Sequence, residues 1–163
     1  MIIVESGMSF DISDDKKVYY IEKEDKYCSI KSRGIASVEV IWLKDEQVLF
    51  VEAKKSAPNP DSNEGDNFAS FLSDINKKFA DSFEIFERVW MENGLSSYFY
   101  NIDFDKYSII FLLVINGFNK EWTIPIRDGL EQQIRKDKTF CALWHPRVIV
   151  INDQQARSKG LIK

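Results

Sequence analysis

Two short apolar segments separated by a polar turn form the clearest pattern in the chain. Val38–Leu43 is apolar except for Glu39, and Gln47–Ala53 is apolar after its first residue except for Glu52. Lys44-Asp45-Glu46 lies between them, and a polar segment of this length closes a β-hairpin. The pattern therefore predicts two antiparallel strands, each with one carboxylate among its apolar side chains.

A long amphipathic helix is predicted over Phe68–Trp90. Its apolar residues recur at steps of three and four, which place them along one side of an α-helix. These residues are Phe68, Phe71, Leu72, Ile75, Phe79, Phe83, Phe86 and Trp90. Asp66 or Asn67 is expected to cap the start, and Gly94 follows the end. Such a stripe predicts packing into a core rather than a surface on which nucleic-acid bases stack.

Further strands and helices are predicted on both sides of this helix. The uninterrupted apolar runs Tyr107–Ile115 and Val148–Ile151 are typical of strands buried on both faces. Short strands are expected at Ile2–Val4, Lys17–Tyr20 and Tyr27–Ser32, helices at 126–136 and at 154–159 after an Asn152-Asp153 cap, and a loop at Ala57–Asn67. Strands that alternate with helices predict an α/β (or α+β) fold, in which helices flank a central mixed β-sheet on both faces.

The two carboxylates in the predicted hairpin are the first candidate for chemistry. Burying a carboxylate in an apolar strand is costly unless it is paired or holds a metal. Glu52 and Lys54 point to the same face because strand side chains alternate, and Glu39 reaches that face if the register allows. Two adjacent carboxylates suit Mg²⁺. A neighbouring lysine stabilises charge on a phosphate or orients a water nucleophile.

The segment Glu52-Ala53-Lys54, which continues into Lys55-Ser56, resembles the ExK motif of the PD-(D/E)xK nuclease superfamily. Glu39 would replace the usual aspartate of that family, although no proline precedes it. The resemblance implies a restriction-endonuclease-like fold over residues 17–151. It also implies catalysis by Glu39, Glu52 and Lys54, with Mg²⁺ or Mn²⁺ held by Glu39 and Glu52, and DNA as the expected nucleic-acid substrate.

One part of that family pattern is not evident in the sequence. The family often draws a further acidic residue from a helix before the first strand, and the sequence predicts no such helix here. Glu5, Glu22 and Glu24 are the candidates for this further acid, and nothing in the sequence chooses among them.

Length and charge bound the function further. At 163 residues the chain is predicted to form one domain, a single nuclease-like unit spanning residues 1–163. A net charge of −4 argues against a broad nucleic-acid-binding surface, but not against local phosphate contacts. Cys28 and Cys141 are distant in sequence, which predicts reduced thiols and a cytoplasmic protein. No membrane contact is expected, because the run Ile109–Ile115 is too short to span a bilayer.

Several other polar residues have simpler interpretations. Asp45 is an alternative to Glu39 as a metal ligand, but its place in the turn predicts exposure. Lys77 and Lys78 are expected on the solvated side of the long helix. The basic residues Arg127, Arg135, Lys136 and Lys138 are a candidate phosphate-binding patch, although acidic neighbours favour an ordinary helix surface. His145, the only histidine, is expected to pack near a strand start rather than to bind zinc.

Two classes of function remain open from the sequence. The first is a metal-dependent nuclease that hydrolyses phosphodiester bonds and acts as a homodimer or beside a partner protein. The second is a non-catalytic nucleic-acid- or protein-interaction domain of the same fold. The acidic composition and the replacement of aspartate by Glu39 favour the second class.

Overall fold

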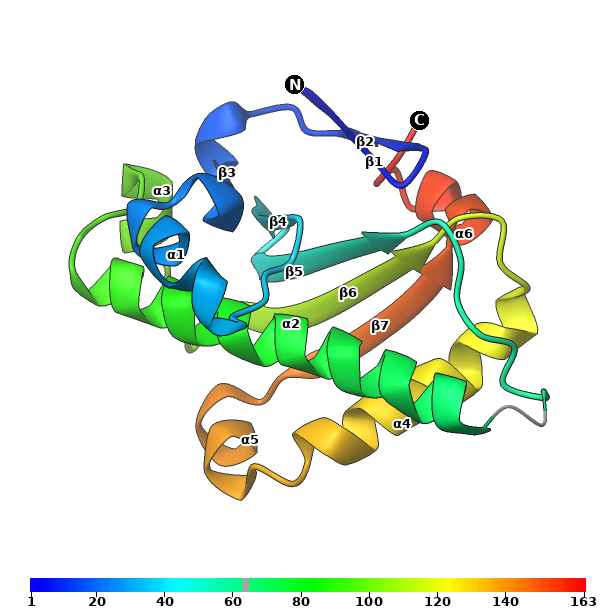
Figure 1. Cartoon of the computed structure of the whole chain (residues 1–163). Coiled ribbons are helices and arrows are strands. Elements are labelled where there is room, and N and C mark those ends of the chain that lie inside the picture. Colours follow the sequence, from blue (N-terminus) through cyan, green and yellow to red (C-terminus); the bar gives the residue numbers. More distant parts are fainter. Residues whose placement is uncertain (63–64) are drawn as a thin grey trace.

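The computed structural model describes residues 1–62 and 65–163, and it contains a five-stranded mixed sheet and a separate two-stranded sheet (Figure 1). The strands are β1 (Ile2–Glu5), β2 (Met8–Asp11), β3 (Val18–Tyr19), β4 (Val40–Lys44), β5 (Gln47–Lys54), β6 (Ser108–Ile115) and β7 (Arg147–Asn152). The α-helices are α1 (Asp25–Ile30), α2 (Gly65–Met91), α3 (Ser97–Tyr100), α4 (Thr123–Ile134), α5 (Lys138–Trp144) and α6 (Asp153–Ser158). Short 3-10 helices lie at Asp15–Lys17, Ile21–Lys23, Lys31–Arg33 and Lys120–Trp122.

The five-stranded sheet has the order β3-β4-β5-β6-β7. Strands β3, β4 and β5 are antiparallel neighbours, whereas β5, β6 and β7 run parallel. The change in direction follows from the connections. The two-residue turn Asp45-Glu46 reverses the chain between β4 and β5, while the long crossovers through α2 and α4 return it to start a parallel strand.

The predicted hairpin, the long helix and both buried strands are confirmed. Asp45 and Glu46 have φ values of 50° and 58°, which is the left-handed pair that a tight two-residue hairpin turn requires. The sheet is mixed and is covered by helices on one face, with a helix and a hairpin on the other, so the predicted central mixed sheet is confirmed at this level.

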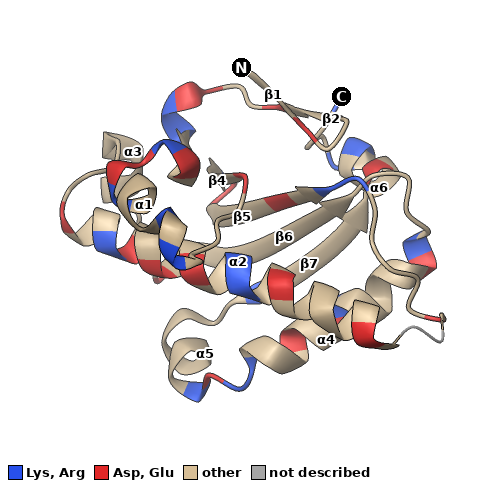
Figure 2. Cartoon of the chain, in the orientation of Figure 1, with Lys and Arg blue, Asp and Glu red and all other residues tan. Residues whose placement is uncertain are grey.

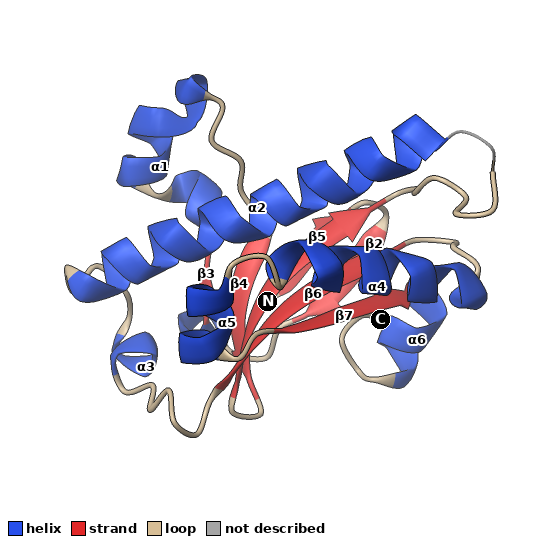
Figure 3. Ribbon diagram, turned by 90° about the horizontal axis from the view of Figure 1, so that it is seen from below, coloured by secondary structure: helices blue, strands red, loops and turns tan. Residues whose placement is uncertain are grey.

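Helices α2 and α4 lie across one face of the sheet (Figure 3). The predicted aromatic stripe of α2 forms the core there: the ring of Phe50 on β5 packs against Phe83 and Phe86, with centroids 5.7 and 5.5 Å apart. Phe79 stacks on Phe111 of β6 at 4.8 Å. The stripe is therefore interior structure and is not available to stack on bases.

The opposite face of the sheet is covered by the β1–β2 hairpin, α6 and the C-terminal residues (Figure 1). The two ends of the chain meet here, because the Lys163 backbone N–H donates to the Ser9 carbonyl at 2.9 Å. Asn152 caps α6 as expected, since its side chain accepts from the Gln155 N–H and the Gln155 side chain accepts from the Asn152 N–H.

Three local predictions are wrong or incomplete. Tyr27–Ser32 is not a strand. Residues Asp25–Ile30 form α1 instead, and this helix contains no buried residue. Asp66 and Asn67 lie inside the first turn of α2 rather than before it. The sequence pattern does not predict α5, because this seven-residue helix is too short to show a helical period.

The predicted loop Ala57–Asn67 includes Asn63 and Glu64, which lie outside the described residues. Residues 57–62 follow β5 without regular helix or strand, as expected for a Pro- and Asx-rich segment. Within residues 1–62 and 65–163, no helix is both long and apolar enough to cross a lipid bilayer.

Candidate functional site

Glu52 lies on the face of β5 that packs against α2. Its alternate neighbour Phe50 contacts the α2 aromatic side chains, so Glu52 and Lys54 point toward the same helix. The Glu52 side chain is 0 % exposed, whereas the Lys54 side chain is 31 % exposed. The sequence prediction that Glu52 and Lys54 share a face is therefore confirmed, and the pair lies at the carboxyl end of β5, the central strand of the sheet.

Two ammonium groups bind the same oxygen of the Glu52 carboxylate. Oε1 accepts from Lys54 Nζ at 2.7 Å and from Lys78 Nζ of α2 at 2.7 Å. Oε2 is buried and has no hydrogen-bond partner among the described residues. A buried carboxylate is tolerated when charge-assisted hydrogen bonds compensate for its lost hydration. Here the compensation is confined to one oxygen, and the other is buried without a partner among the described residues.

Glu39 lies immediately before β4, next to Glu52. Its backbone N–H donates to the Val51 carbonyl at 3.1 Å, and Val40 pairs with Val51 in the sheet. Burial raises the pKa of Glu39 to about 7, and the charges of Glu52 and Glu5 add to this rise. Glu39 therefore lies close enough to Glu52 for the two carboxylates to repel each other, which is the condition that a bound cation relieves.

Helix α2 also fixes the backbone segment that carries Glu39. The Ala36 N–H donates to Asp81 Oδ2 at 2.8 Å, and the Val38 N–H donates to Ser82 Oγ at 2.8 Å. Ser82 is fully buried, so the second bond is shielded from water. Because these acceptors lie one turn beyond Lys78, the same part of α2 positions both Glu39 and the partner of Glu52.

The fold narrows the choice of a further acidic residue for the site among Glu5, Glu22 and Glu24. Glu5 and Glu22 both raise the pKa of Glu39 through their charges, whereas Glu24 accepts a hydrogen bond from the Tyr19 hydroxyl at 2.9 Å. Glu5 arrives through the β1–β2 turn, where Ser6 Oγ donates to the Ala53 carbonyl at 3.0 Å. The charge of Glu5 has the larger effect on the pKa of Glu39, but among residues 1–62 and 65–163 no three acidic side chains gather around one metal position.

Lys78 of α2 also belongs to the cluster around Glu52, where the sequence favoured a solvated face over a catalytic residue on this helix. The expectation that it lies on a solvated helix face is wrong, because only 26 % of its side chain is exposed and it binds Glu52. Burial is the largest influence on its pKa and lowers it, but the hydrogen bond and charge of Glu52 together with the charge of Glu39 raise the pKa overall. The sequence contains one signal for this contact, because Lys78 lies three residues after Ile75 and therefore at the border of the apolar stripe of α2.

The remaining candidates lie outside this cluster. Asp45 is 82 % exposed in the hairpin turn and pairs with Lys44, so it is not a ligand beside Glu52. Lys77 pairs with Asp81, one turn along α2, at 2.6 Å. Lys55 is exposed beyond the end of β5. His145 ends α5 in a left-handed conformation near the start of β7.

Two of the four residues of the candidate basic patch pair with nearby acids in the chain. Arg127 binds Asp128 at 2.8 Å, and Arg135 binds Glu131 at 3.2 Å. Figure 2 shows basic and acidic residues interspersed along the helices, with basic colouring at the end of β5 and in the middle of α2. Two basic side chains, Lys54 of β5 and Lys78 of α2, are instead found together beside Glu52.

The carboxylate oxygens of the site suit a hard cation that takes only a few of its ligands from the protein. Among residues 1–62 and 65–163 no group of three or more Asp, Glu, His or Cys side chains is placed to hold a metal ion. Glu39 and Glu52 offer carboxylate oxygens, and the unpartnered Oε2 of Glu52 is one of them. Mg²⁺ is commonly held by one or two carboxylates, with water and substrate phosphate completing its shell. The site fits that mode and not an all-protein cage.

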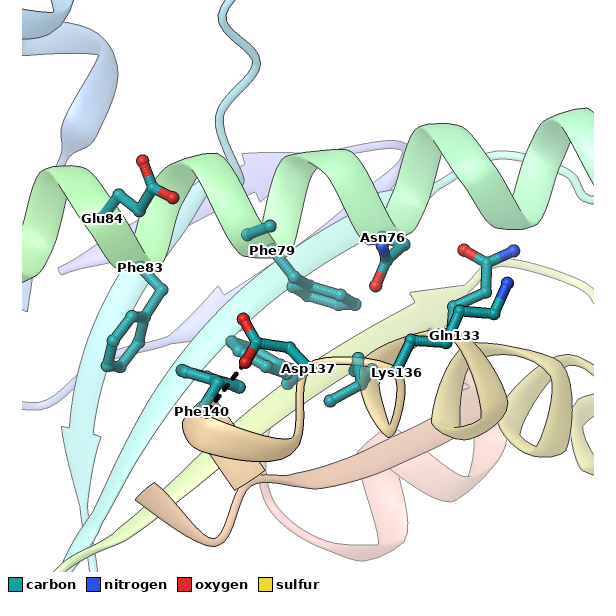
Figure 4. A pocket seen from close by; sticks show the side chains of 11 residues that line it. Asn76, Phe79, Phe83, Glu84, Gln133, Lys136, Asp137 and Phe140 are labelled. Atoms are coloured by element: carbon teal, nitrogen blue, oxygen red, sulfur yellow. Dashed lines mark hydrogen bonds between the residues drawn. The ribbon is translucent and has the colours of Figure 1, made fainter. Parts of the chain in front are cut away.

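A separate cavity of about 280 Å³ lies between α2 and the α4–α5 segment (Figure 4). Phe79, Phe83 and Phe140 form apolar parts of its wall, with Asn76 and Gln133 on one side. It contains none of the residues predicted for catalysis, and the site around Glu52 is therefore distinct from it.

No protein-family model, curated protein or solved structure matches the chain. Its function is therefore inferred from the side chains gathered around Glu52 and from their chemistry.

Proposed function

We propose that this protein is a metal-dependent nuclease whose site consists of Glu39, Glu52, Lys54 and Lys78. The observation that carries the proposal is the buried, unpartnered Oε2 of Glu52, which lies beside a second carboxylate and two lysines. Orphaned buried polar atoms are rare in folded proteins and call for an explanation. A divalent cation shared by Glu39 and Glu52 supplies one.

The order of the elements supports the same proposal. An antiparallel meander of β3, β4 and β5 is followed by α2 and by β6, which runs parallel to β5. This order accords with the restriction-endonuclease-like fold implied by the sequence resemblance. The two acids and Lys54 lie where the second and third strands of the meander pair, as that resemblance implies.

The chemistry assigns a task to each side chain. Glu39 and Glu52 would hold Mg²⁺ or Mn²⁺, which supplies an activated water and neutralises phosphate charge when bound. Lys54 would place its ammonium group against the phosphate oxygens as negative charge grows in the transition state. Lys78 would remain on Glu52 and keep that carboxylate oriented. DNA is the proposed substrate, and a homodimer or a partner protein is the proposed assembly.

The test is cleavage of labelled single- and double-stranded DNA and of RNA with Mg²⁺, Mn²⁺ or EDTA. We expect metal-dependent cleavage that Glu39→Gln and Lys54→Met reduce by at least about a hundredfold, the scale on which loss of one transition-state contact acts. Lys44→Met is the matched control, because Lys44 lies at the opposite end of the same hairpin. An absence of cleavage by the wild type under all conditions would reject the proposal.

A non-catalytic interaction domain is the second candidate, and one observation favours it. The two lysines on Oε1 already neutralise Glu52, so the carboxylate can remain buried without a cation. In that case Glu39→Gln would leave the affinity for nucleic acid or protein unchanged, and added metal would not stabilise the fold.

A further inference from the structure

A hollow of about 300 Å³ lies beside the ion pairs of Glu52. Lys54 at the end of β5 lines it together with Lys77 and Lys78 of α2, and Asp74 is the carboxylate among its lining residues. Because Lys54 and Lys78 also bind Glu52, the hollow opens directly next to the site already described. Three ammonium-bearing side chains thus border one depression on a chain whose net charge is −4.

Lys54 and Lys78 share one carboxylate as their ion-pair partner at this hollow, while Asp74 among the lining residues offsets part of their charge. Glu52 balances one of the two ammonium groups that it binds, and the other is left with weaker carboxylate neighbours. Glu39 is one of these neighbours, and its charge acts on Lys78 through space without a hydrogen bond between them. An anion that enters the hollow would therefore meet two ammonium groups that share a single carboxylate partner.

Lys77 adds an ammonium group that is easily redirected. It pairs with Asp81 one helical turn away, and 49 % of its side chain is exposed. Exposed pairs of this spacing contribute only a few tenths of a kcal/mol, so exchange of Asp81 for another anion costs little. Asp81 would keep its second interaction, the hydrogen bond from the Ala36 N–H.

Apolar side chains that line the hollow strengthen the electrostatic interactions of these ammonium groups. Phe71 and Ile75 line it between the lysines, and Ile75 is 1 % exposed. Charges next to an apolar wall are less screened than charges in open water. The hollow therefore combines apolar walls with a rim of ammonium groups, a combination that suits a compact anion.

We propose that this hollow is a subsite for a backbone phosphate of nucleic acid, held by Lys54, Lys77 and Lys78. The inference rests on the proposed function, because it takes the substrate of that site to be a polynucleotide. It extends the proposed function by naming where a phosphate of the strand is held and by adding Lys77, which pairs with Asp81, to the binding surface. Inorganic pyrophosphate presents the same chemistry without a strand, so the two sources are separated in the test.

The experiment measures binding in EDTA, where no cleavage occurs. Fluorescence anisotropy with a labelled single-stranded DNA is recorded over a series of salt concentrations for the wild type, Lys77→Met, Lys78→Arg and Lys44→Met. Loss of one phosphate-binding lysine is expected to reduce the slope of log Kd against log salt by about 0.7 in Lys77→Met. Lys78→Arg keeps the charge and is expected to retain the wild-type slope, as is the control Lys44→Met.

Other outcomes overturn the inference. It is wrong if Lys77→Met binds with the wild-type slope, or if the wild type binds pyrophosphate in calorimetry but not the DNA. Lys77 is exposed and outside the core, so misfolding does not obscure its result. Cleavage that persists in Lys77→Met with unchanged binding would reject the subsite and keep the nuclease. Binding that weakens as expected in a protein that cleaves nothing would reject the nuclease and keep the subsite.

Discussion

Ionisation of Glu39 lowers the stability of the fold, whereas the proposed metal binding requires it. It is half-buried and lies near two other carboxylates, and burial together with their charges raises its pKa to about 7. A carboxyl group whose folded-state pKa exceeds its ordinary value of 4.5 binds its proton more tightly in the folded protein. Ionisation of Glu39 therefore destabilises the fold, and a cation would remove that cost.

The first prediction concerns the pH dependence of stability. Glu39 contributes no penalty below its ordinary pKa, and the penalty grows as pH rises from about 4.5 to about 7 and is complete above that. When the pH is raised from about 5 to about 8, the free energy of unfolding of Glu39→Gln should therefore increase by about 1 kcal/mol relative to that of the wild type. This value is reduced for solvent screening. Urea denaturation at both pH values measures it.

Glu121→Gln serves as the control for this comparison, since Glu121 is exposed on a short 3-10 helix away from the site. It should change stability equally at both pH values. If Glu39→Gln behaves in the same way as Glu121→Gln, the carboxylates around Glu39 do not interact as the structure indicates.

At the scale of elements, α2 does more than cover the sheet. Its apolar stripe packs on β5 and β6, its Lys78 binds Glu52, and its Ser82 accepts a hydrogen bond from the Val38 N–H. The stripe was predictable because residues three and four apart share a helix face. The two polar contacts were not, because they depend on where α2 crosses the strands.

The second prediction tests how α2 holds the segment before β4. Ser82→Ala removes the acceptor of the buried Val38 N–H and leaves that donor unsatisfied, which should cost about 1–3 kcal/mol in the free energy of unfolding. Ser73→Ala, on the exposed side of the same helix, should cost less than about 0.5 kcal/mol. Equal effects in urea denaturation would show that the Ser82 bond does not anchor the segment.

At the scale of the whole molecule, the two ends of the chain meet on the face of the sheet opposite α2. The β1–β2 hairpin is joined to the C-terminus by the bridge between Phe10 and Ile162. Its turn is held on the end of β5 through Ser6, and on β6 through the Asn116 side chain, which donates to the Ser6 carbonyl at 3.1 Å. This attachment brings Glu5 toward Glu39.

The third prediction concerns metal linkage, which acts on the whole fold. An ion that binds the folded chain and not the unfolded one stabilises it, by about 2.7 kcal/mol at a hundredfold excess over its Kd. Mn²⁺ should therefore raise Tm in the wild type and leave Glu39→Gln unchanged. Scanning calorimetry with Mn²⁺ and with EDTA measures this. A wild-type Tm that is insensitive to Mn²⁺ and to Mg²⁺ would remove the support for a cation between Glu39 and Glu52.

The sequence by itself determined the local elements and one half of the site. Alternation along β5 placed Glu52 and Lys54 on one face, and the periodicity of α2 defined its core side, because both depend only on near neighbours in the chain. It misjudged Tyr27–Ser32, where no apolar period exists and the chain forms the short helix α1 followed by a 3-10 turn.

Only the tertiary structure decided which side chains complete the site. Lys78 meets Glu52 across 26 residues, and Glu5 comes near Glu39 from the first strand of the chain. Such contacts depend on the crossing of α2 over β5 and on the docking of the terminal hairpin. Both are set by how complete apolar faces pack together, which no short segment of the chain specifies.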